Sequence, residues 1–164
     1  ELDEYRLTGS RIVVNPERFL VRGSGVRQRI LVHELVHVAT RPVAGPLVPS
    51  WLEEGVAQAI GEERSTTGTR LLDALSGDGL TLPTDAQFTS GGRDRIFLSY
   101  QLSWSFVDHL RDRFGAETVA RFYAAVGDGG IAGPGTTTHV VDRAAREVFG
   151  SPFPELIAAW RADR

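Results

Sequence analysis

The sequence predicts an α+β fold, with a small N-terminal β-sheet packed on a pair of helices and a mainly helical C-terminal lobe. Three observations support this prediction. Residues near the N-terminus are rich in β-branched side chains and are divided by turn-forming residues. Two segments with helical periodicity follow, and prolines or glycines end them. The rest of the chain shows helical patterns separated by glycine-rich loops. We expect one domain over residues 1–164, with sub-lobes at roughly 1–61 and 62–164 and a cleft between them.

The predicted strands lie in the first 25 residues. The run Arg-Ile-Val-Val at residues 11–14 favours a strand and ends at Asn15-Pro16, a pair typical of turns. A second run, Phe-Leu-Val at residues 19–21, is followed by glycines, and residues 2–7 supply a third candidate.

Residues 26–40 show a helical pattern that ends at Arg41-Pro42. Apolar side chains occupy nearly every side of this helix, which is typical of a buried helix. We therefore expect residues 26–40 to form the most enclosed element of the chain.

Further helices are expected along the remaining chain. Ser50 is a good N-cap for a helix that Gly61 stops. Residues 77–95, rich in glycine, aspartate, threonine and serine, predict a loop. The other predicted helices lie at residues 71–76, 99–114, 116–126, 138–149 and from Ser151-Pro152 onward.

The composition is that of a globular domain and excludes several functions. A net charge of −3, without any basic run interleaved with aromatic residues, argues against a nucleic-acid partner. No apolar stretch is long enough to span a membrane. Because the chain contains no cysteine, disulfides and thiolate metal ligands are excluded.

The residue usage also bears on origin. All 18 basic residues are arginine, which indicates a GC-rich bacterial genome. The absence of cysteine leaves the compartment open and slightly favours an extracellular or cell-surface location. Since the chain contains no methionine, we expect it to be part of a longer gene product.

The helix at residues 26–40 carries two histidines that suit a metal ion. His33 and His37 are four residues apart, so both imidazoles project from one side of the helix. This spacing is typical of two ligands of one tetrahedral Zn²⁺. Glu34 is rotated by about 100° from His33, where it can take a proton from a metal-bound water without binding the metal. The alternative is a buried helix with two hydrogen-bonded histidines, but two imidazoles on an otherwise apolar helix are costly to bury without a shared partner.

A catalytic zinc site needs a third protein ligand and one open position. Glu53 and Glu54 lie on the next predicted helix, and a helix, a turn and a return helix fit between His37 and this pair. The spacing alone leaves both glutamates open as the third ligand.

The sequence HELVH at residues 33–37, followed by PSWLEEGVA at residues 49–57, resembles the gluzincins of the thermolysin and aminopeptidase type. It is most similar to the small bacterial domains called peptidase MA-like. This resemblance implies that the glutamate before glycine, Glu54, is the third ligand and that Glu53 points away as a solvated charge. It also places Gln58 where these families often have an acidic residue that hydrogen-bonds a metal-bound imidazole. An amide can accept that hydrogen bond, but it lacks the charge.

The resemblance implies a further role for Tyr100, because related peptidases use a downstream tyrosine to stabilise the oxyanion of the reaction. An aromatic core residue beside Phe97 and Trp104 is an equally good interpretation of Tyr100. His109 and His139 lack a partner at ligand spacing and are expected to be surface or packing residues. Arg93 and Arg95, in the predicted loop, are candidates for contacting a substrate carboxylate, although such arginines are usually solvated.

The expected function is that of a zinc-dependent metallopeptidase that holds one Zn²⁺ and acts on a peptide or protein substrate. In this hypothesis Glu34 is the general base, and the region of residues 11–21 holds an extended substrate by β-augmentation. Two alternatives remain: a catalytically weak or inactive zinc-binding domain, and a metal-free helical interaction module. Endopeptidase activity, aminopeptidase activity and a dedicated processing role all fit the same residues. The aminopeptidase is mildly disfavoured, because no acidic anchor motif for a free amine precedes the helix at residues 26–40.

Overall fold

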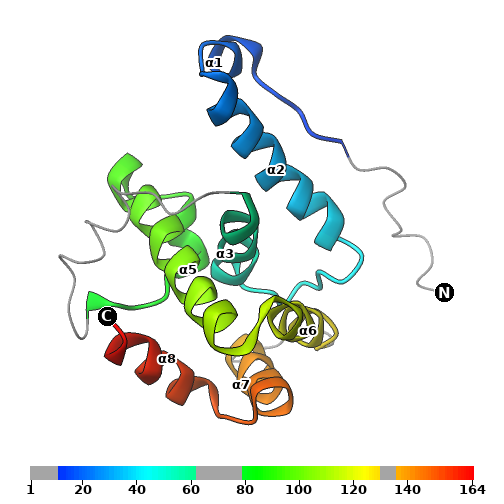
Figure 1. Cartoon of the computed structure of the whole chain (residues 1–164), viewed down its shortest axis with the longest axis vertical. Coiled ribbons are helices and arrows are strands. Elements are labelled where there is room, and N and C mark those ends of the chain that lie inside the picture. Colours follow the sequence, from blue (N-terminus) through cyan, green and yellow to red (C-terminus); the bar gives the residue numbers. More distant parts are fainter. Residues whose placement is uncertain (1–10, 62–78, 130–135) are drawn as a thin grey trace.

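The computed structural model describes residues 11–61, 79–129 and 136–164 (Figure 1). Every regular element in these ranges is a helix, so the predicted α+β fold with an N-terminal sheet is wrong for the described residues. In chain order the elements are α1 (Pro16–Leu20), α2 (Ser24–Thr40), α3 (Ser50–Gly61), the short 3-10 helix η3 (Asp85–Phe88), α5 (Gly92–Phe114), α6 (Ala116–Gly127), α7 (Thr136–Phe149) and α8 (Phe153–Ala162).

The expected strands fail for identifiable reasons. Residues 11–15 are extended, but no strand pairs with them among the described residues. Asn15-Pro16 starts a helix instead of a turn, because the Asn15 side chain accepts a hydrogen bond from the backbone N–H of Arg18 and proline suits the first helical position. Residues 19–21, expected to be a strand, form the end of α1 and its C-cap. The strand candidate at residues 2–7 and the helix candidate at residues 71–76 lie outside the described residues.

The later helices occur where the sequence predicts them, with shifted ends. The largest shift is in α5, which begins at Gly92 within the expected loop. The last helix is capped by Pro152, and the Asp142 carboxylate of α7 accepts a hydrogen bond from the backbone N–H of Phe153 at 2.8 Å.

The core lies among α3, α5, α6, α7 and α8. Aromatic rings join three of these helices: Phe106 of α5 contacts Trp51 of α3 and Trp160 of α8, with ring centroids 5.5 Å and 5.3 Å apart. The indole N–H of Trp160 donates to the hydroxyl of Ser105 at 3.0 Å, so the polar atom of this buried ring is satisfied. Buried aromatic side chains of this kind each contribute about 3–5 kcal/mol when compared with alanine.

Helix α3 approaches α5 closely because residue 55 is glycine. A β-carbon at Gly55 would lie 2.6 Å from the Val107 side chain and 2.7 Å from the backbone oxygen of Ser103. Any larger residue would therefore separate the two helices. The residue that follows Glu54 thus fixes α3 against the most buried helix of the core.

Helix α2 is not the most enclosed element, contrary to the expectation from its apolar sequence. Figure 1 shows α1 and α2 extending away from the other helices, and α2 packs mainly on α3. Only Val36 of α2 is buried, while Leu35 is 54% exposed. Periodicity shows which sides of a helix are apolar, but it does not show how many neighbours cover them.

Among the described residues, no helix is long and apolar enough to cross a membrane.

Candidate metal centre

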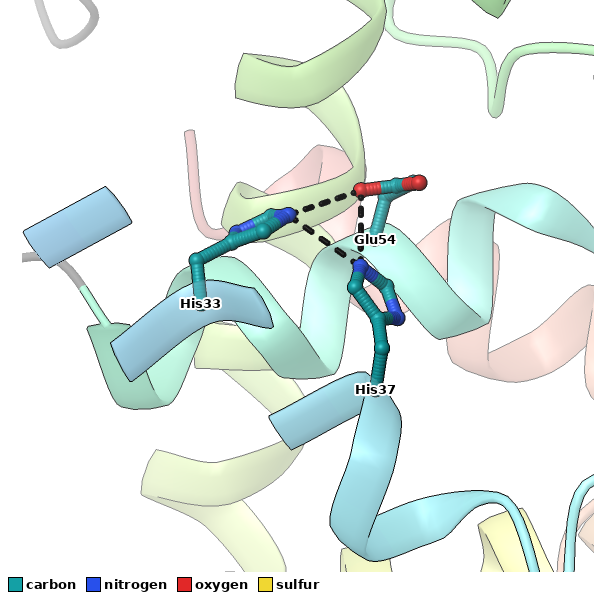
Figure 2. Close-up of side chains that lie close together, drawn as sticks. All are labelled: His33, His37 and Glu54. Carbon is teal, nitrogen blue, oxygen red and sulfur yellow. Dashed lines mark hydrogen bonds and ion pairs between the residues drawn. The ribbon is translucent and has the colours of Figure 1, made fainter. Parts of the chain in front are cut away.

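Three side chains from α2 and α3 meet where these helices pack together. Figure 2 shows His33 and His37 of α2 pointing toward Glu54 of α3. The Nε2 atom of His33 lies 3.1 Å from Oε2 of Glu54 and 3.2 Å from Nε2 of His37. The Nε2 atom of His37 lies 3.4 Å from the same carboxylate oxygen. All three donor atoms therefore converge on one point.

These separations fit a tetrahedral zinc ion. Metal–ligand distances of about 2.0–2.1 Å in a tetrahedron place neighbouring ligand atoms about 3.3–3.4 Å apart. The three separations of 3.1, 3.2 and 3.4 Å lie close to that value. Two imidazole nitrogens and one carboxylate oxygen are also ligands that zinc prefers. Among the residues that the structure describes, no other group of three or more histidine, aspartate or glutamate side chains has this arrangement.

The electrostatics of the group favour a deprotonated carboxylate. Burial raises the pKa of Glu54, but hydrogen bonds from His33 and His37 outweigh burial and lower the pKa to about 2. The hydrogen bond to Glu54 raises the pKa of His37 above 6.5, against the effect of partial burial. A bound cation would therefore compete with a proton for His37.

The start of α3 is held by a residue far along the chain. Asp85 of η3 accepts a hydrogen bond from the backbone N–H of Ser50 at 2.9 Å. Ser50 is thus the first residue of the helix rather than its expected N-cap. A carboxylate at a helix N-terminus also interacts favourably with the helix dipole. The sequence pattern gave no signal for Asp85, because the contact joins residues 35 positions apart.

Glu34 lies beside the group without belonging to it. It is half-buried and lines a cavity of about 300 Å³ between residues 11–15 and α2. His37 lines the same cavity. Glu34 and one imidazole of the group therefore face a common space that is large enough for part of a ligand.

Tyr100 of α5 lies beside His33 of the group. Its ring centroid is 6.2 Å from that of His33 and 5.3 Å from that of Phe88. Burial, and then the charges of Glu54 and Glu34, raise the pKa of Tyr100 to about 12. Its hydroxyl therefore stays protonated at neutral pH, as a hydrogen-bond donor must.

The two remaining predicted residues of α3 are both shielded from solvent. Gln58 is 8% exposed and lies one turn after Glu54, so it is not a surface glutamine. Its hydrogen bond to an imidazole stays a prediction. Glu53, expected to be a solvated charge, is half-buried, and burial raises its pKa while His37 opposes that rise. The charge of Glu53 in turn contributes to the raised pKa of His37.

The other histidines and the two loop arginines lie apart from this group. His109 pairs with Asp163, with Nδ1 and Oδ2 3.3 Å apart, and His139 is exposed on α7. Arg93 and Arg95 are exposed on the first turn of α5, not on a loop.

Comparison of the chain with known protein families, with curated proteins and with solved structures finds no match.

Proposed function

We propose that the protein is a zinc-dependent metallopeptidase that holds one Zn²⁺ on His33, His37 and Glu54. The observation that supports this proposal most strongly is the mutual separation of the three donor atoms, 3.1–3.4 Å, which matches a tetrahedral ligand set. Three protein ligands leave the fourth position open, as catalytic zinc sites do.

Bound zinc would supply Lewis acidity and would lower the pKa of water toward about 7, so that hydroxide would be available near neutral pH. Glu34 takes the proton of the attacking water and passes it to the leaving amine. Its position supports this role, because it follows the ligand His33 directly and faces the same cavity as His37. An inert structural site would have no use for a carboxylate at this position.

Tyr100 donates a hydrogen bond to the oxyanion that forms during peptide hydrolysis. Its pKa of about 12, which keeps the hydroxyl protonated near neutral pH, and its place beside His33 support this role. The competing hypothesis is a zinc-binding domain with weak or no catalysis, and the amide of Gln58 in place of a carboxylate favours it to some extent.

Glu34→Gln tests the proposal against this competitor. The substitution keeps shape and removes the base, so the variant retains one zinc per chain and loses turnover by about 10²–10⁴-fold. Turnover is measured with a fluorogenic peptide library and zinc by elemental analysis. Glu117→Gln on the exposed surface of α6 is the matched control and leaves both quantities unchanged. Equal turnover in wild type and Glu34→Gln, or none in zinc-loaded wild type, would contradict the proposal.

A further inference from the structure

We propose that the cavity beside Glu34, the α2 cavity, binds an acidic stretch of peptide that also carries an apolar side chain. This inference rests on the proposed function and names the substrate class for the same site. The α2 cavity is the space of about 300 Å³ between residues 11–15 and α2.

About half of the wall of the α2 cavity is apolar. Val13 and Val14 line one side, and Ile30, Leu31 and Val38 of α2 line the other. Val13 is 82% exposed and Ile30 37%, so much of this apolar surface contacts solvent. Covering it with an apolar side chain of a ligand gains about 25 cal/mol per Å² buried. A volume of 300 Å³ accommodates one or two side chains.

The charged groups on the cavity wall select the ligand. Arg11 and Arg41 both line it, and neither has an ion-pair partner among the described residues. Glu34 is the one carboxylate on the described lining, and it has the role of base in the proposed function. Guanidinium groups bind carboxylates through paired hydrogen bonds, so two arginines favour a ligand with acidic side chains.

The formal charge of residues 11–41 as a whole is positive, like that of Arg11 and Arg41. Residues 11–41 contain six arginines and two glutamates, although the whole chain has a net charge of −3. These charges favour an anionic peptide over a basic one along residues 11–41, while Glu53 and Glu54 of α3 act against them near His37.

The backbone N–H and C=O groups of residues 11–14 are candidate hydrogen-bond partners for an extended peptide. Among the described residues, this segment makes no backbone–backbone hydrogen bonds through its N–H and C=O groups. A peptide lying along it would place alternate side chains into the α2 cavity, next to Glu34 and His37.

The test compares two labelled peptides that differ only in having glutamates or glutamines around a central leucine. Binding is measured by fluorescence anisotropy on zinc-loaded Glu34→Gln protein, so that hydrolysis does not interfere. The acidic peptide is expected to bind about three- to tenfold more tightly. The ratio of the affinities for the acidic and the neutral peptide is expected to fall toward one in the double variant Arg11→Gln/Arg41→Gln. The same ratio is expected to decrease in high salt.

Arg18→Gln is the matched control, because Arg18 is exposed on α1 and carries the same charge outside the α2 cavity. It is expected to keep the preference for the acidic peptide. Equal binding of the two peptides, or equal loss of preference in Arg18→Gln and the double variant, overturns the inference.

The ratio of kcat/KM for the same two peptides on wild-type protein separates this inference from the proposed function. Hydrolysis of both peptides without charge preference overturns the substrate class and leaves the peptidase intact. Charge-selective binding without hydrolysis overturns the proposed peptidase activity but leaves the binding site for acidic peptide intact.

Discussion

Gly61 of α3 lies directly against His33 of α2. A β-carbon on Gly61 would come within 3.1 Å of the backbone nitrogen of His33 and within 3.3 Å of its β-carbon. The absence of a side chain at Gly61 therefore sets how closely α2 approaches the helix that carries Glu54.

Replacing Gly61 by alanine is predicted to weaken zinc binding more than it weakens the fold. The new methyl group meets α2 backbone, so α2 must shift by a few tenths of an ångström and carry His33 away from Glu54. We expect zinc affinity to fall about tenfold or more. The melting temperature of zinc-free protein should change little, because α2 lies outside the core and alanine favours a helix.

Gly25→Ala is the control for Gly61→Ala, since a β-carbon at Gly25 has only one ordinary contact, at 3.7 Å, with the Arg29 side chain. Competition titration with a chromogenic chelator measures both variants. Similar zinc affinities of wild type and Gly61→Ala would show that the close approach does not position His33.

Tyr100→Phe is predicted to lower kcat by about 10²-fold and to leave zinc content unchanged, because it removes one donor to the oxyanion. The ring contact with Phe88 at 5.3 Å remains possible, so stability should be nearly constant. Since the pKa of Tyr100 is about 12, its deprotonation should not limit the rate below pH 11. An unchanged kcat would support the interpretation of Tyr100 as a packing residue.

The stabilisation that zinc gives should increase with pH. In zinc-free protein the raised pKa of His37 means that its pairing with Glu54 stabilises the fold below pH 6.5 and is lost as pH rises through the raised value. Zinc binds only deprotonated imidazole, so zinc competes with protons more effectively as pH rises. The difference in melting temperature with and without zinc should therefore be larger at pH 8 than at pH 5.5. A larger difference at pH 5.5 would contradict this coupling.

Asp85→Ala is predicted to destabilise the fold by about 1 kcal/mol, because it removes the acceptor for the first N–H of α3. Asp85→Asn retains a hydrogen-bond acceptor, so its loss of stability should be only a few tenths of that of Asp85→Ala. Urea denaturation measures both. Equal stability of all three proteins would mean that the contact between Asp85 and Ser50 does not hold the helix.

The ligand group could be predicted from the sequence because its geometry is mostly local. The spacing of His33 and His37 on one helix follows from helical periodicity alone. Choosing Glu54 over Glu53 needed the resemblance, and the structure places the Glu54 carboxylate against both imidazoles. That this group binds a metal ion, and that the ion is zinc, remains a prediction.

The errors concern tertiary surroundings, which local patterns do not encode. Residues 11–14 have the composition of a strand, but a strand needs a partner, and β-propensity mainly reports packing against one. The apolar sequence of α2 predicted burial, yet α2 packs mainly on α3 and leaves Leu35 exposed. The contacts of Gly61 with His33 and of Asp85 with Ser50 join separate elements, and no sequence motif predicts them.

The most direct test of the account is the zinc content of the protein purified without added metal. Elemental analysis is predicted to give one zinc per chain for wild type and a large loss for Glu54→Gln, which keeps the size of the side chain but removes its charge. Wild-type protein that contains no zinc, and that takes up none when zinc is offered at pH 8, would contradict the central claim.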